Sequence, residues 1–167
     1  VVDLEGLARH KGSLLGALPG VPQPSQKQFE TQLAQALAEL DLTRPIYVEG
    51  ESVKIGRVAL PLNLVEQLRA APVIEVQATP EARLAYLLRD YAYLGDDPDA
   101  LAAKLAWLKE LQGKERVGRW QAWALAHELS PLFDELMRLH YDPHYERSQS
   151  RNFQQWAARQ IVASADL

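Results

Sequence analysis

The sequence predicts an α/β fold, a three-layer sandwich around a parallel sheet. Two observations lead to this prediction: short β-branched runs typical of buried parallel strands, and amphipathic helical patterns that separate them in a β-α-β-α-β order. The 167 residues, 47% of them hydrophobic, match the size and composition of one globular domain.

The expected strands are four short segments at residues 1–5, 45–49, 72–78 and 160–164. Between them, Ser25 and Gln28 have the spacing of a helix capping box, residues 62–70 form a second helical pattern, and Thr79-Pro80 is a helix start. Further helical patterns at 97–111, 116–128 and 130–140 predict a helical insertion at about residues 96–147. We therefore expect residues 1–167 to form one partial α/β domain that carries this insertion.

Composition narrows the classes of function. The net charge of −4 argues against a strongly basic nucleic-acid surface on average, although a local basic patch remains compatible with it. The absence of Cys excludes disulfides, a Cys nucleophile and Cys-ligated metal within these residues. No run approaches the roughly 20 apolar residues of a membrane span, and no signal-peptide pattern is present, so we expect a cytoplasmic protein without a membrane partner.

Polar loops follow the predicted strands, and ligands bind at the carboxyl ends of strands in parallel sheets. Positive charge, flexible backbone and hydroxyl donors in these loops predict a phosphate or anion site. Glu49, at a strand end, is the candidate to act as a base or to hold a metal-bound water. The candidate binding residues in these loops are His10, Lys11, Gly12, Ser13, Glu51, Ser52, Lys54, Gly56 and Arg83. The alternative interpretation is that these are ordinary solvated loops.

A second polar cluster, residues 140–148, contains two His, two Tyr, two acids and an Arg. Tyr141 and Tyr145 are candidates for stacking on a base, and Arg147 for binding phosphate. His140 and His144 have the spacing of a metal pair, but Pro143 argues against a continuous helix, so we expect no metal site here. The alternative is a helix stop with a solvated polar face.

Four Trp residues lie in or near the insertion, at positions 107, 120, 123 and 156. Trp120 and Trp123 are three residues apart on one helical face. Such Trp residues are more often core than a base-stacking platform.

Four motifs resemble the tRNA 2-selenouridine synthase family, and together they extend over nearly the whole chain in the family's order. They are residues 4–13 (LEGLARHKGS), 24–30 (PSQKQFE), 48–56 (VEGESVKIG) and 140–148 (HYDPHYERS). One departure is Lys11, where family members usually have Arg; Lys keeps the charge but not the fork of donors.

The resemblance implies a P-loop kinase-like domain that follows a rhodanese-like domain with a catalytic Cys. Such proteins act on 2-thiouridine at the wobble position of certain bacterial tRNAs, and so are transferases. The sulfur is geranylated with geranyl diphosphate and then replaced by selenium from selenophosphate, with Mg²⁺ as a candidate ion. The Walker A motif of the family lies just ahead of the segment that opens this chain. We therefore expect a missing N-terminal part to be a partner of this chain, and the isolated chain to be inactive.

By the same resemblance, Lys11, Ser13, Lys54 and Arg147 would bind diphosphate, selenophosphate or tRNA phosphate. Gln26, Lys27 and Arg83 are supporting candidates for this site. Glu49 would be a Walker-B-like acid. Two other classes of function stay open. One is a P-loop kinase of nucleotides or small molecules, which the Thr79–Arg83 segment after a strand also suits. The other is a non-catalytic interaction module built on the Trp-bearing helices.

Overall fold

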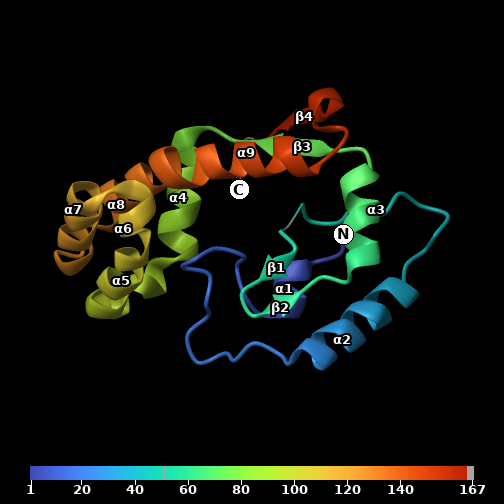
Figure 1. Cartoon of the computed structure of the whole chain (residues 1–167), viewed down its shortest axis with the longest axis horizontal. Coiled ribbons are helices and arrows are strands. Elements are labelled where there is room, and N and C mark those ends of the chain that lie inside the picture. Colours follow the sequence, from blue (N-terminus) through green and yellow to red (C-terminus); the bar gives the residue numbers. More distant parts are fainter. Residues whose placement is uncertain (51, 165–167) are drawn as a thin grey trace. The chain divides into compact units, whose positions relative to one another are not determined.

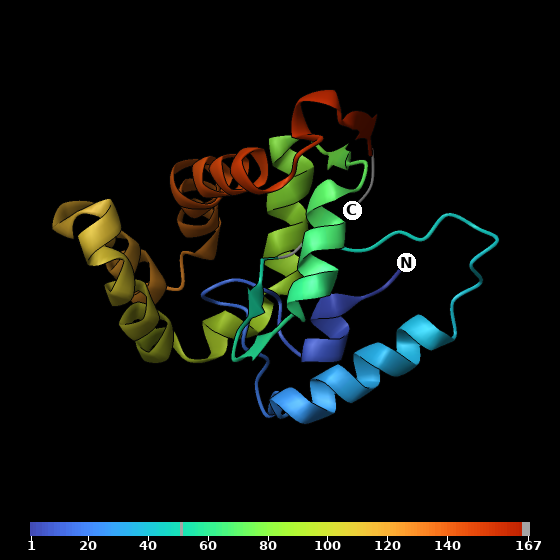
Figure 2. The same cartoon turned by 45° about the vertical axis from the view of Figure 1, so that its right-hand side comes forward.

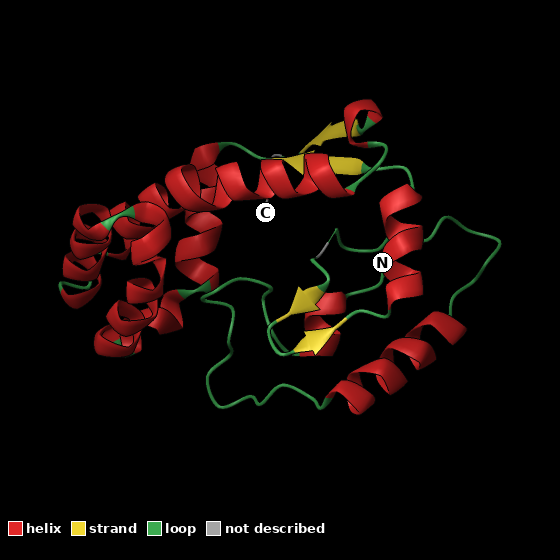
Figure 3. Ribbon diagram, viewed as in Figure 1, coloured by secondary structure: helices red, strands yellow, loops and turns green. Residues whose placement is uncertain are grey.

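The computed structural model describes residues 1–50 and 52–164, and within them helices predominate over short strands (Figures 1 and 3). The chain divides into two compact units, Val1–Ala71 and the part from Pro72 onward, and each is described by itself. The architecture is mixed helix and strand, as predicted. The two sheets of the described residues have two strands each, and the predicted three-layer parallel sheet is not confirmed.

The first unit contains three α-helices and an antiparallel hairpin among its described residues. They are α1 (Leu4–Ala8), α2 (Gln26–Ala38), β1 (Lys54–Ile55), β2 (Val58–Ala59) and α3 (Leu62–Ala70). Ser25 and Gln28 form the predicted capping box of α2, and Phe29 and Leu33 bury the apolar stripe of that helix. The core joins all five elements and contains Val2, Leu4, Ala8, Phe29, Leu33, Ile55, Val58, Leu60 and Val65.

The predicted strand at residues 1–5 is wrong, because a helix begins at Leu4. Asp3 caps this helix by accepting a hydrogen bond from the Gly6 amide at 2.6 Å, and Glu5 lies in the acidic first turn. Pairing with the predicted strand at 45–49 is reduced to one parallel bridge, Val2 with Val48. The helix cap at Asp3 therefore outweighs the strand preference of the apolar residues at 1–5, and only the first residues of this segment remain extended.

The second unit is mainly helical. Its elements are β3 (Ile74–Gln77), α4 (Pro80–Asp90), η1 (Ala92–Asp96), α5 (Pro98–Leu105), η2 (Ala106–Leu108), α6 (Lys109–Gln112), α7 (Lys114–Leu125), α8 (Leu129–Leu136), η3 (Met137–Tyr141), α9 (Asp142–Asn152), η4 (Trp156–Ala158) and β4 (Gln160–Ala163). Strands β3 and β4 lie within the predicted strands at 72–78 and 160–164, and they pair in parallel from Ile74 with Gln160 to Gln77 with Ala163. Thr79 and Asp97 cap α4 and α5, as predicted from their Pro-containing starts.

The predicted helix stop near His140 is wrong. The helix runs from α8 through a π-helical segment, η3, into α9, which ends at Asn152 (Figure 2). Pro143 lies at the first turn of α9, directly after this wider segment. Proline lacks an N–H and crowds the carbonyl four residues earlier, so a wider turn in front of it lets the helix continue.

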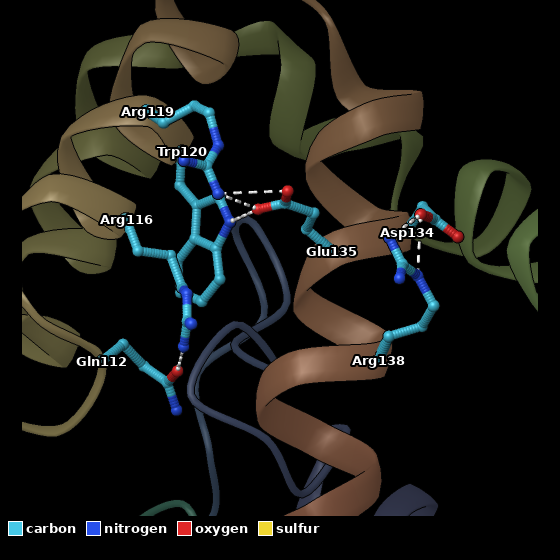
Figure 4. Close-up of polar contacts among 7 residues, drawn as sticks. All are labelled: Gln112, Arg116, Arg119, Trp120, Asp134, Glu135 and Arg138. Carbon is cyan, nitrogen blue, oxygen red and sulfur yellow. Dashed lines mark hydrogen bonds and ion pairs between the residues drawn. The ribbon is translucent and has the colours of Figure 1, made fainter.

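Trp120 is completely buried, which confirms the prediction of a core residue. Its indole Nε1 donates to Glu135 Oε2 at 2.9 Å, and Arg119 pairs with the same carboxylate at 2.8 Å (Figure 4). Burial raises the pKa of Glu135, but the hydrogen bonds from Arg119 and Trp120 outweigh it and hold the pKa below its ordinary value. Trp120 therefore joins α7 to α8 through both packing and a charged hydrogen bond.

Two glycines with positive φ test the packing of the first unit. Gly56 (φ 59°) lies in the β1–β2 turn, where an added Cβ would collide with the Gln23 carboxamide, whereas Gly20 (φ 67°) has open space around it. We expect Gly20→Ala to lower the free energy of unfolding by about 1 kcal/mol, the cost of the left-handed backbone alone. Gly56→Ala should cost about 2–4 kcal/mol, because the hydrogen bonds of Gln23 are also lost. Urea unfolding of both variants measures this difference, and equal costs would contradict the packing described.

Candidate functional site

Glu49 lies at the amino end of α1. Its Oε2 accepts hydrogen bonds from the backbone amides of Leu4 at 2.7 Å and Glu5 at 3.1 Å. Together with Asp3, it supplies acceptors for amides that the first turn of a helix leaves without intrahelical partners. The carboxylate predicted as a base thus has a definite structural task, which is to hold α1 against the chain after Val48.

Gln23 connects the carboxyl end of α1 to the hairpin. Its Nε2 donates to the Ala8 carbonyl at 3.1 Å and to the Ile55 carbonyl at 3.0 Å, and its Oε1 accepts from the Arg57 amide at 2.8 Å. One carboxamide therefore meets three backbone groups from two separate segments. It joins the end of α1, from which the loop at residues 10–17 continues, to the β1–β2 turn.

The loop at residues 10–17 is closed by its own backbone. The Lys11 amide donates to the Gly16 carbonyl at 2.9 Å, and the Gly16 amide donates to Ser13 at 3.0 Å. His10 is buried and forms an antiparallel bridge with Ala17, while Gly12 adopts φ 61°. The predicted group His10–Ser13 is thus a compact turn beside the end of α1.

Of the other predicted residues in this unit, some form hydrogen bonds within the fold and others are exposed to solvent. The Gln26 carboxamide pairs with both backbone groups of Ala59, at 2.8 and 2.9 Å, so it fastens α2 to β2. The Ser52 hydroxyl donates to the Lys54 carbonyl and thereby forms a local turn. The Lys27 and Lys54 side chains are exposed, and neither ammonium has a hydrogen bond or ion pair to another residue of 1–50 and 52–164. Glu51 lies outside the described residues.

Four predicted residues belong to the second unit. Arg83 forms a two-bonded ion pair with Asp142, so its guanidinium serves the junction of α4 and α9. Tyr141 packs edge-on against His140, and Tyr145 packs edge-on against Trp156. Arg147 is exposed on α9. The structure therefore gathers His10–Ser13, Gln26, Ser52, Lys54 and Gly56 in one unit, with Glu49 at the other end of α1.

The His pair also differs from its prediction. The rings of His140 and His144 lie 4.9 Å apart between centroids, so the helix places them on one face despite Pro143. Gln112 Nε2 lies 3.2 Å from His140 Nδ1. Among the described residues no group of three or more His, Cys, Asp or Glu is arranged to hold a metal ion.

Sequence reasoning missed Gln23 as a site-forming residue. It lies in a segment rich in Gly and Pro, yet Gln23 is half-buried and Pro24 is buried. A polar residue between two prolines, Pro22 and Pro24, was the available signal. The hairpin of β1 and β2 was also missed, although Gly56 marks its turn.

Comparison with known proteins places this chain in a family. A family model described as the tRNA 2-selenouridine synthase AAA domain matches residues 1–104. The chain belongs to this family. The tRNA 2-selenouridine synthase of Shewanella denitrificans is 35% identical over an alignment of 181 residues, which covers 92% of this chain and 49% of that protein. The proteins of the same name from Alcanivorax borkumensis and Nitrosomonas eutropha are 45% and 42% identical over 92 and 94 residues, each covering 54% of this chain.

The chain spans about half of the Shewanella synthase and a quarter of the other two. No solved structure matches. The residues matched by the tRNA 2-selenouridine synthase model include α1, the turn at 10–17 and the β1–β2 hairpin, and they end within α5. In the part of the chain that the structure describes, no helix is long and apolar enough to span a membrane.

His140 makes the stability of the fold depend on pH. Burial, followed by the neighbouring His144, lowers the pKa of His140 below its ordinary value of 6.5. The unfolded chain then binds more protons than the native one as pH falls below that value, so this residue makes stability decrease from neutral toward acid pH. We expect His140→Gln to flatten that decrease in urea unfolding between pH 7.5 and 5. His127→Gln, at an exposed His, is the matched control and should keep the wild-type slope.

Proposed function

We propose that this chain is part of an enzyme that converts 2-thiouridine at the wobble position of tRNA to 2-selenouridine. The family match over residues 1–104 carries the proposal, because the matched part includes the turn and hairpin of the candidate site. The relatives bear the name of this activity, and the remainder of the activity would reside in the parts of those proteins that this chain does not cover. The isolated chain would accordingly be inactive.

The chemistry proposed is a transferase reaction in two stages. Geranyl diphosphate would first alkylate the sulfur, and its C–O bond would break to release diphosphate. The selenium of selenophosphate would then displace the alkylated sulfur, which leaves as geranyl thiol, and water would cleave the P–Se bond to release phosphate. Both substrates carry phosphate groups, and the turn at Lys11–Ser13 beside the hairpin offers cationic side chains and backbone donors for them. The exposed Lys54 ammonium is the group best placed in this unit to meet a phosphate from solvent.

Each carboxylate oxygen of Glu49 would have its own role. Oε2 accepts the hydrogen bonds that orient the first turn of α1, so Oε1 is the oxygen that would take part in the reaction. A carboxylate fixed in this manner suits the outer sphere of a Mg²⁺ ion, where it would hold a metal-bound water. We therefore propose Glu49 as a positioning acid of the phosphate site.

We further propose that β3 and β4 belong to a larger parallel sheet of P-loop type in the complete protein. Parallel strands are normally covered on both faces, yet four β-branched side chains of this pair are 41–62% exposed: Ile74, Val76, Ile161 and Val162. Such an exposed apolar pair is typical of strands that gain further neighbours. The bridge of Val2 with Val48 is a second short piece of parallel pairing.

The test uses the complete protein that contains this chain, with tRNA bearing 2-thiouridine, geranyl diphosphate and selenophosphate. Nucleoside mass spectrometry should detect geranylated 2-thiouridine and then 2-selenouridine. We expect Lys54→Ala to reduce the rate at limiting substrate by roughly 10- to 100-fold, since a charged hydrogen bond contributes about 1.5–3 kcal/mol. Arg44→Ala, at an exposed cation of the same unit, should retain wild-type activity.

Each outcome of this assay has a definite meaning. Phosphate transfer to a small molecule, with the tRNA unchanged, would replace the proposal with a kinase activity. Unchanged activity of Lys54→Ala, with 2-selenouridine still formed, would overturn the assignment of the phosphate site while keeping the function. Trp120 is unsuitable as a probe of partner binding, because its complete burial makes any substitution a test of folding.

A further inference from the structure

Helix α9 has one face that packs against the rest of its unit. Gln149 is buried on this face, and Asp142 binds Arg83 there. Glu146 accepts a hydrogen bond from the Trp156 indole at 3.2 Å. These contacts fix the orientation of α9 and also decide which side chains it turns to solvent.

The opposite face is polar and carries positive charge. His144, Arg147, Ser148 and Arg151 follow one another at the three- and four-residue spacing that places side chains on one side of a helix. Arg147, Ser148 and Arg151 are exposed, and His144 is half-buried. Within residues 1–50 and 52–164, neither the Arg147 nor the Arg151 guanidinium makes an ion pair or hydrogen bond. We call these four residues the α9 face.

The acidic side chains of α9 belong to its packed face. Asp142 is paired with Arg83, and Glu146 accepts a hydrogen bond from the Trp156 indole. The two arginines of the α9 face therefore keep their charge uncompensated in a chain whose net charge is −4. A cationic strip on an otherwise acidic chain selects a polyanionic partner.

We propose that the α9 face binds the phosphodiester backbone of the tRNA substrate, a step that rests on the function proposed above. Arg147 and Arg151 are one helical turn apart, about 6 Å along the axis. Each guanidinium would donate paired hydrogen bonds to a phosphate, and Ser148 adds a hydroxyl between them. The face contains no apolar side chain, so it lacks what a membrane-inserting helix or an apolar protein groove needs.

Helix α9 lies beyond the family-model match, which ends at residue 104, so tRNA binding would be a function of this later part of the chain. Phosphate contacts fix the position of a nucleic acid without reading its sequence. The α9 face would therefore hold the body of the tRNA, whereas the phosphate site of the first unit would take the small substrates. These are separate binding tasks with separate residues.

The experiment measures binding of an unmodified, fluorescently labelled tRNA transcript to the complete protein at several KCl concentrations. We expect Arg147→Ala/Arg151→Ala to weaken binding at least tenfold at low salt. The slope of log affinity against log salt should fall by about 1.4–1.8, the value for two lost phosphate contacts. Lys109→Ala/Lys114→Ala removes the same charge from exposed positions of the same unit and should retain the wild-type affinity and slope.

A second variant, Arg147→Lys/Arg151→Lys, keeps the charge but not the paired donors. It should keep the salt slope and lose part of the affinity.

Wild-type affinity and slope in the Ala variant would overturn the inference, and so would an equal loss in the Lys109/Lys114 control. Binding to phosphatidylserine vesicles that depends on the two arginines, with tRNA binding unaffected, would also overturn it. Failure of the wild-type protein to bind or modify tRNA would instead refute the proposed function itself.

Discussion

The candidate site depends on the hydrogen bonds of the Gln23 carboxamide. It meets the last carbonyl of α1, the Ile55 carbonyl and the Arg57 amide, so one side chain satisfies backbone groups at both the helix end and the hairpin turn. The two carbonyls cannot pair with each other, since both are acceptors, and leaving half-buried backbone groups unpaired is costly. Gly56 makes the approach of Gln23 sterically feasible. The end of α1 and the hairpin turn are therefore held together by a residue that belongs to neither element.

Glu49 plays the corresponding part at the other end of α1. A helix of five residues has few internal hydrogen bonds, so its position is set by contacts at its two ends and by the burial of Leu4 and Ala8. Glu49 and Asp3 supply the acceptors at the amino end, and Gln23 supplies the donor at the carboxyl end. In the second unit, the Arg83–Asp142 pair has a similar task, because it fastens the start of α9 to α4.

Local signals in the sequence predicted local structure well. The caps at Ser25, Thr79 and Asp97 were predictable because their partners lie three residues away, within the same turn. The first strand was mispredicted because its apolar run was weighed above the Asp3 cap, and because the second acceptor, Glu49, lies more than 40 residues along the chain. The helix stop predicted near His140 was wrong for another reason. A π-helical segment accommodates Pro143, so the helix continues past it.

The candidate site could be predicted only in part. Lysine, glycine and serine in two loops indicated a phosphate site, and both loops do lie in one unit. The structural roles of Gln26 and Gly56 were not predictable, since the Ala59 backbone and the Gln23 side chain that they meet are brought near only by the tertiary structure. Ser52 differs, because its hydroxyl bonds the carbonyl of Lys54, two residues along the chain. For the same reason Arg83 was assigned to anion binding, although the structure pairs it with Asp142.

Gln23 holds the end of α1 and the β1–β2 turn together, and amide hydrogen exchange of the wild-type protein and the Gln23→Ala variant tests this role directly. We expect faster exchange at the Arg57 amide and throughout the hairpin turn in the variant, with the exchange of α7 unchanged as an internal reference. Unaltered protection at Arg57 in a folded Gln23→Ala protein would contradict it.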